Sequence, residues 1–496
     1  MNFSNQILGI CTVLLSAVCF FLAFSYFKKG NYVRSLLLIF FCGLILRFFA
    51  GMDFHLHPWD ERYHALAAKN LLRHPLKPTL YEEPIFEYDY RSWTNNHIWV
   101  HKPPLPLWLI MLSLQVFGIN EMAVRLPSIV LSSLGILLTY YIGKHFFDEK
   151  VGLLASFFYS INGFLIDLAT ARRPTDHPDT MFIFFIELGI FLSVYYVRRP
   201  SNILLLLIGI ATGCGVLTKW LPALLVVAVL FLLLIRQESW KRATAKCIVV
   251  TLVAAAVAIP WQVFIYSAYA REAAWESYFN YRHLIEPLDG HKGTVFFYLA
   301  LMPRVFGELI YIPVIMFFHA LARKRLPPQS TVLGIWFIVP YLFFSFVATK
   351  MPGYVMISAP ALFIILSWAF WTVKSSLDTD FFRKTRILFL ALLLLLPVRY
   401  SLERIKAFQN IDRNPSWAQE LRELNRKIPP SKAVVFNVDY FIEAMFYADV
   451  TAYPFVPTRE QIQQARGKGF AVFIFDNSLL PSDIRSDSTV TILPRK

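Results

Sequence analysis

Charged residues are scarce in this chain of 496 residues. They make up 16% of it, whereas hydrophobic residues make up 56%. The apolar residues gather in runs of about 20, long enough to cross a bilayer as helices whose backbone groups satisfy one another without water. This pattern excludes an ordinary soluble globular protein and predicts an integral membrane protein.

Several other features are missing. The five cysteines all fall within or beside apolar runs and show neither metal-ligand spacing nor a disulfide pattern, so buried, inert thiols are expected. We find no Walker loop, dinucleotide fingerprint, internal repeat or low-complexity segment. The first apolar run lacks a basic leader and a small-residue cleavage site, so it is expected to stay as a membrane helix.

About twelve apolar segments are candidate membrane spans. Several are short for a bilayer about 30 Å thick, which leaves their ends loosely defined. The segments are 7–27, 36–52, 121–143, 151–168, 180–197, 202–217, 220–235, 247–266, 303–321, 332–348, 354–373 and 387–400. The run 105–118 is too short to cross, and we expect an interfacial or re-entrant helix that starts after Pro103 and Pro104.

Every second connection between these spans is basic. Two examples are the groups at 28–34 and 323–325. The positive-inside rule places these connections in the cytoplasm. Topology and anionic headgroups therefore explain the net charge of +15 better than nucleic acid does. The remaining connections, which carry most of the unexplained polar residues, fall together on the extracytoplasmic face.

The composition changes at about residue 401. Helical spacing at 415–427 and 458–466 alternates with strand-like runs at 432–438 and 469–476. The predicted fold class is a polytopic α-helical membrane protein with interfacial helices and a small C-terminal α/β domain. The expected domains are 1–400, which includes a large first extracytoplasmic loop at 53–120, and 401–496.

The first loop carries the densest group of polar residues. Asp60 and Glu61 open a predicted amphipathic interfacial helix over 60–73, although an acidic residue is also an ordinary helix cap. His101 precedes a rigid KPPLP turn, which begins with Lys102. Hydrocarbon cannot solvate these groups, so they are expected at or outside the membrane surface.

Three later extracytoplasmic segments add further polar residues. ARRPTDHPDTMF has two acids where a helix cap needs one, and 267–302 is expected to be a solvated loop or a polar lid over a cavity. These segments and the TKMPGY turn contribute Asp176, Asp179, Arg282, His283, His291, Lys350 and Tyr354. The carboxylates can take a proton, and the cations suit a phosphate group.

The motifs resemble one known family. WDERYHALAAKNL, HKPPLPLW and EMAVRLPS, followed by RRPTDHPDTMFIF, LTKW, RHLIEPLDGHKGTVFFYLALMP and TKMPGY, resemble the polyprenyl-phosphate-dependent GT-C glycosyltransferases over roughly 36–365. The nearest group is family 39, which includes protein mannosyltransferase-like and lipid A aminoarabinose transferase-like members. The resemblance implies a GT-C fold and an inverting hexosyl or pentosyl transfer from a polyprenyl-phosphate sugar to a lipid, glycan or protein acceptor on the extracytoplasmic face.

The resemblance also assigns roles by position. Asp60 corresponds to the catalytic aspartate of the family, with Glu61 and Asp179 as further candidate acids. Lys102, Tyr354, Arg282 and Lys350 are candidate donor-phosphate contacts, and His101, Asp176, His283 and His291 are candidate substrate or metal ligands. His101 stands where some relatives have an acid, and Trp99 where some have tyrosine, so a divalent cation stays open as a cofactor.

Two alternatives predict different features. A lipid-linked sugar flippase or transporter predicts ionisable groups near the bilayer midplane and often a repeat, whereas the notable charges here lie at span ends. A noncatalytic membrane scaffold would leave the KPPLP and TDHPD motifs unexplained. The single internal glycosylation sequon, at Asn2, favours a bacterial inner membrane, with the site facing the periplasm or cell exterior.

Overall fold

The computed structural model describes residues 4–174, 176–375, 380–428, 432–476 and 480–494. The chain folds into two compact units. The helical unit comprises Met1–Gly51, Ser128–Phe264 and Ser277–Ile411, and the mixed unit comprises Met52–Pro127, Ile265–Glu276 and Asp412–Lys496.

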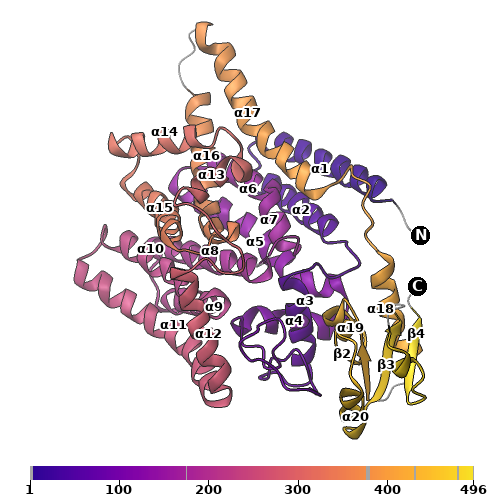
Figure 1. Ribbon diagram of the computed structural model, residues 1–496. Coiled ribbons are helices and arrows are strands. Elements are labelled where there is room, and N and C mark those ends of the chain that lie inside the picture. The colour runs from indigo at the N-terminus through magenta and orange to yellow at the C-terminus, as the bar shows by residue number, and fades with distance from the viewer. Residues whose placement is uncertain (1–3, 175, 376–379, 429–431, 477–479, 495–496) are drawn as a thin grey trace. The chain divides into compact units, whose positions relative to one another are not determined.

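Long apolar helices dominate the helical unit (Figure 1). In the described residues, nine helical segments are long and apolar enough to cross a membrane, and two bent pairs raise the number to eleven. The long helices are α1 (Asn5–Lys28), α2 (Tyr32–Ala50), α5 (Glu121–Phe146), α8 (Asp176–Arg198), α9 (Asn202–Lys219), α11 (Trp240–Ala268), α15 (Thr331–Phe346), α16 (Ala359–Lys374) and α17 (Asp380–Ile405). These results confirm the predicted polytopic helical class.

The remaining predicted spans are bent or short. α6 (Glu149–Ile161) and α7 (Gly163–Ala169) meet at 56°, and α13 (Phe297–Phe306) and α14 (Tyr311–Ala322) meet at 110°. The predicted segment 220–235 corresponds to a short 3-10 turn followed by α10 (Leu225–Leu234). Short and bent segments at these places explain why the sequence defines the number of membrane spans only approximately.

The break between α6 and α7 has a local cause. Asn162 leaves the helix with an extended backbone, and its side chain accepts a hydrogen bond from the Leu165 backbone N at 3.0 Å. Arg47 of α2 donates to the Ser160 carbonyl at 3.1 Å and to the Ser132 hydroxyl at 2.9 Å. A buried arginine within an apolar helix therefore satisfies backbone that the break exposes.

The mixed unit contains a four-stranded parallel sheet in the order β2-β1-β3-β4. Its strands are β1 (Ala433–Phe436), β2 (Thr451–Ala452), β3 (Ala471–Asp476) and β4 (Val490–Pro494), and its C-terminal helices are α18 (Ser416–Lys427), α19 (Phe441–Tyr447), α20 (Arg459–Gly467) and α21 (Ser482–Arg485). The central strand β1 is buried throughout because parallel strands joined by helices are covered on both faces. Thr458 and Gln461 start α20 with a capping box.

The first loop shares the core of this sheet. α3 (Asp60–Leu71) and α4 (Pro104–Phe117) belong to the mixed unit. Leu66 and Tyr81 pack in one apolar cluster with Phe436 and Tyr453, and the Tyr81 and Tyr453 rings stack with centroids 5.2 Å apart. The sequence assigns the loop to 1–400 and the strands to 401–496, whereas the structure packs the two into one core.

Two local expectations differ from the structure. The helix predicted over 60–73 is not amphipathic, because ten of the twelve residues of α3 are buried, with α4 and α19 packed against it. The loop expected over 267–302 instead begins with the helix α12 (Ala270–Ile285). The short helix expected over 105–118 is confirmed as α4, which Pro104 opens at its first position.

Candidate functional site

Asp60 and Lys102 meet in the mixed unit. The Lys102 Nζ lies 3.3 Å from Asp60 Oδ1, with 19% of the lysine side chain and 9% of the aspartate side chain exposed. Asp60 is the first residue of α3, where the helix dipole favours a carboxylate. Trp59, just before it, has a φ of 76°, a strained backbone conformation that clusters at functional sites.

Glu61, the neighbour of Asp60, lies in a different environment. The Arg125 guanidinium donates to both of its oxygens, at 2.7 and 3.0 Å, and the His57 backbone N donates at 2.6 Å. Burial by itself would raise the pKa of the Glu61 carboxyl, but the charges of Arg125 and His57 lower it far below its usual range. Such a fully enclosed carboxylate is a poor proton acceptor, which favours a structural role.

His64 lies one helical turn after Asp60. It is fully buried, and its ring meets the Trp99 ring at a centroid distance of 5.7 Å. Burial lowers the pKa of His64 to about 3, although the nearby Asp60 carboxylate opposes that shift. The imidazole is therefore neutral at physiological pH.

His101, beside Lys102, pairs with an acid that sequence reasoning missed. Its Nδ1 lies 2.9 Å from Oε2 of Glu276, near the middle of α12. The Trp93 ring stacks on the imidazole with centroids 4.9 Å apart and a 10° angle between planes. The histidine beside Lys102 thus has an acidic partner that comes from α12.

A second group of polar residues lies in the helical unit. Lys219, at the end of α9, forms an ion pair with Asp179, and its Nζ sits 4.7 Å above the Tyr354 ring centroid. Asp179 is buried in the first turn of α8. Trp220, directly after Lys219, has a φ of 69°. The structure thus brings the predicted residues Asp179 and Tyr354 to one cation.

Sequence reasoning did not select Lys219 as a site residue. The signal was available, because a lysine in LTKW ends an apolar span on the extracytoplasmic side. Asp176, in contrast, opens α8, but its side chain lies outside the described residues.

Lys350 has a structural environment. Its buried ammonium donates to the carbonyls of Phe344 at 3.0 Å, Ser345 at 2.7 Å and Val347. Three carbonyls match the three hydrogens of an ammonium, and they lie at the C-terminus of α15, where a cation is favoured. This arrangement favours a helix cap rather than a donor-phosphate contact.

The other predicted residues of this region lie along one segment. Arg282 pairs with Glu286 at 2.8 Å, and His283 Nδ1 lies 2.9 Å from the Phe279 carbonyl. The His291 carbonyl accepts from the Lys350 backbone N at 3.1 Å. Arg282 is partly exposed and is paired with a partly exposed acid.

A divalent cation fits these residues poorly. Among the residues whose placement is described, no three His, Cys, Asp or Glu side chains come together as a metal site. Asp60 faces Lys102, and His101 faces Glu276. A hard cation needs several converging oxygen or imidazole donors, and the described side chains do not supply them.

Comparisons with known proteins agree with this architecture. Residues 101–264 match the family described as dolichyl-phosphate-mannose-protein mannosyltransferase. The chain is 28% identical to the undecaprenyl phosphate-alpha-4-amino-4-deoxy-L-arabinose arabinosyl transferase of Pseudomonas paraeruginosa over 283 residues, 53% of this chain and 49% of that relative. The chain thus spans about half the length of this curated relative.

Solved structures show the fold. The crystal structure of ArnT from Cupriavidus metallidurans bound to undecaprenyl phosphate superposes with a TM-score of 0.61 at 17% identity and covers 89% of this chain and 88% of that one. AglB from Archaeoglobus fulgidus, in complex with an inhibitory peptide and a dolichol-phosphate, gives 0.59 at 13% identity, covering 86% and 65%.

These likenesses show that the chain has the GT-C fold seen in ArnT and AglB, and its apolar helices mark an integral membrane protein. Within that class, the resemblance to the polyprenyl-phosphate-dependent glycosyltransferases of family 39 is confirmed.

Proposed function

We propose that this chain is a glycosyltransferase that moves a hexosyl or pentosyl group from a polyprenyl-phosphate donor to a lipid, glycan or protein acceptor. The observation that carries the proposal is the Asp60 carboxylate 3.3 Å from the Lys102 ammonium on the first loop. A group that can take the acceptor proton thus lies beside a cation that can hold the donor phosphate.

The reaction is a single displacement at the anomeric carbon. An acceptor oxygen forms the new bond from one side while the bond to the phosphate oxygen breaks on the other, so the configuration inverts. The acceptor proton passes to Asp60, and the polyprenyl phosphate leaves as an anion. Positive charge that develops on the sugar ring is characteristic of glycosyl transfer.

Cations stabilise the leaving group. An ammonium has three hydrogens, so Lys102 can donate to a phosphate while it keeps its contact with Asp60. In the helical unit, taken by itself, Lys219 pairs with Asp179 and lies over the Tyr354 ring, and Arg282 offers a fork suited to two phosphate oxygens. Such preorganised donors act on charge that grows in the transition state.

The ligands of two solved structures and the charge pattern of the chain support the donor class and the location. ArnT was solved with undecaprenyl phosphate and AglB with dolichol-phosphate, both polyprenyl phosphates. Every second connection is basic and therefore cytoplasmic, which orients the first loop away from the cytoplasm. We therefore place the site on the periplasmic or outer face of a bacterial inner membrane. The transporter alternative is not favoured, because the named relatives are transferases.

The test is the Asp60→Asn variant in a radiolabelled assay with a polyprenyl-phosphate sugar and membrane acceptors. Removing the proton acceptor is expected to lower turnover by about 100-fold or more, the range of general-base catalysis. Donor binding, measured separately, should stay within a few-fold of the parent.

The matched control is Asp483→Asn, which removes an exposed carboxylate paired with Arg459. It should retain full turnover. If Asp60→Asn turned over at the parental rate, Asp60 would not be the base. A parent that moved the intact lipid-linked sugar across vesicles without transferring it would instead be a transporter.

A further inference from the structure

In the C-terminal sheet, the connections that follow the neighbouring strands β1 and β3 run in opposite directions. The order β2-β1-β3-β4 means that the chain leaves β1 toward β2 on one side and leaves β3 toward β4 on the other. In open parallel sheets, such a reversal opens a crevice at the carboxyl ends of the two strands, and ligands bind there.

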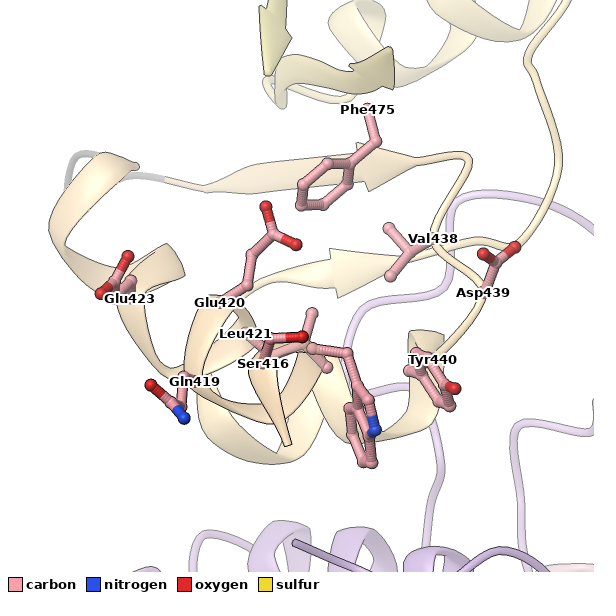
Figure 2. Close-up of a pocket in the computed structure, with 10 residues that line it drawn as sticks. Ser416, Gln419, Glu420, Leu421, Glu423, Val438, Asp439, Tyr440 and Phe475 are labelled. Carbon is pink, nitrogen blue, oxygen red and sulfur yellow. The ribbon is translucent and has the colours of Figure 1, made fainter. Parts of the chain in front are cut away.

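A cavity lies at this point. It has a volume of about 340 Å³, within the range of small-molecule sites. Figure 2 shows Val438, Asp439 and Tyr440, which follow β1, on one side and Phe475, near the end of β3, across from them. The remaining lining comes from α18, including Glu420 and Glu423. The strand order and the cavity thus identify the same place independently.

Hydrogen bonds of Asn437 fix the backbone at the end of β1. Asn437, the residue after β1, has a φ of 61°, which turns the chain sharply out of the sheet. Its side-chain amide donates to the Phe475 carbonyl at 2.9 Å, and its backbone N donates to the Phe455 carbonyl at 3.0 Å. Because the first bond ties the end of β1 to β3 and the second ties it to the segment after β2, the cavity walls are preformed.

The lining chemistry indicates a class of ligand. The described lining has three aromatic side chains, three carboxylates, an amide and two hydroxyls, and no lysine or arginine. Trp417 and Tyr440 stack with centroids 4.1 Å apart and a 13° angle between planes, which gives a rigid aromatic wall. Carboxylates accept hydrogen bonds from hydroxyl or ammonium groups and repel phosphate.

We infer that this cavity binds a sugar unit without negative charge, neutral or amino-substituted. The apolar face of a pyranose packs on an aromatic ring, while its hydroxyls donate to carboxylates. A protonated amino group on the sugar is also attracted to the carboxylates and to the faces of the aromatic rings of the cavity. In the proposed transfer, on which this assignment rests, the unit belongs to the acceptor, because the anionic donor phosphate is disfavoured here.

The test uses the full chain in detergent micelles without donor lipid. The probes are N,N′-diacetylchitobiose, its de-N-acetylated form and glucuronic acid, each titrated by calorimetry and checked by saturation-transfer NMR. At least one of the first two should bind, and glucuronic acid should not. Tyr440→Ala is expected to weaken binding about tenfold, the loss typical when one stacking ring is removed.

Control variants separate this effect from unfolding. Tyr440→Phe keeps the ring and should bind within about twofold of the parent, and Glu460→Gln, an exposed acid on α20, should bind unchanged. Asp439→Asn should weaken the amino-sugar probe more than the acetylated one.

Several outcomes would overturn the assignment. They are binding of neither chitobiose form, equal binding of glucuronic acid, and parental affinity in both Tyr440→Ala and Asp439→Asn. Since binding is measured without transfer, its failure is distinct from that of the catalytic proposal, which the Asp60→Asn assay tests.

Discussion

Adjacent acids have opposite roles at the residue scale. Glu61 is fully buried and its carboxylate takes two hydrogen bonds from Arg125, whereas Asp60, also buried, faces Lys102, whose side chain is 19% exposed. Glu61→Gln would leave the buried Arg125 charge without its counter-ion. We expect a loss of about 3–5 kcal/mol of stability, seen as a lower melting temperature in detergent.

Asp60→Asn serves as the comparison for this prediction. It removes one charge of a pair whose lysine keeps access to water, so the melting temperature should change less than in Glu61→Gln, while turnover falls by about 100-fold or more. Equal melting temperatures for Glu61→Gln and the parent would show that the Arg125 pair contributes nothing to folding.

The buried His64 predicts a pH dependence. Its pKa is about 3 in the fold against an ordinary 6.5, so the unfolded chain binds the proton more readily between these values. Stability is therefore present above about pH 6.5 and is lost as the pH falls toward 3, by up to about 1.4 kcal/mol per pH unit. The melting temperature of the parent should fall between pH 7 and pH 5.

His64→Phe keeps a ring against Trp99 and removes the titrating group. Its melting temperature should fall less steeply over the same interval, whereas His74→Gln, an exposed control, should follow the parent. Burial also lowers the pKa of His97, to about 4, so part of the slope should persist. An unchanged slope in His64→Phe would assign the whole effect to other groups.

At the scale of the element, Lys350 belongs to the end of α15. Its ammonium satisfies carbonyls of Phe344, Ser345 and Val347. Lys350→Met should therefore lower the melting temperature and leave the donor Michaelis constant unchanged. Lys102→Met should raise the donor Michaelis constant and change the melting temperature little. The loss of a charge-assisted phosphate contact should lower kcat/KM by an amount equivalent to about 1.5–3 kcal/mol. If Lys350→Met raised the donor Michaelis constant, Lys350 would contact the donor after all.

The sequence predicted elements well where one physical signal was strong. Apolar length located the long helices, and Pro104 located the start of α4. α12 was missed because its sequence is polar and Glu272 and Glu276 are buried where a periodic helix would carry apolar residues. β2 has only two residues, too few for an alternating pattern to appear.

The sequence indicated which residues belong to the candidate site better than it indicated which residues contact one another. The motifs identified Asp60, Lys102, Asp179 and Tyr354, and the structure pairs the first two and joins the last two through Lys219. Lysines 102 and 350 look alike in sequence, since each lies beside a proline-containing turn. Only the surrounding carbonyls, which folding brings together, separate a helix cap from a substrate contact.

At the scale of the whole molecule, the two units draw on segments far apart in the chain. Tyr81 from the first loop stacks on Tyr453 from the C-terminal segment, and Lys69 of α3 donates to the Met445 carbonyl of α19 at 2.7 Å. Local sequence patterns cannot reveal such pairings, because loop closure between distant segments leaves no periodic trace. If the first loop is extracytoplasmic, the C-terminal sheet must therefore be so as well.

This shared core makes the membrane orientation testable. Single cysteines at Asp289 and Asp439 should react with a membrane-impermeant maleimide in intact spheroplasts, because both exposed positions are expected outside the cytoplasm. A cysteine at Gln237, exposed in the basic connection before α11, should react only after the membrane is opened. Labelling is compared with the parent, whose five cysteines lie within or beside apolar runs. If Gln237→Cys reacted in intact cells and Asp439→Cys did not, the orientation would be inverted, and the proposed site would face the cytoplasm.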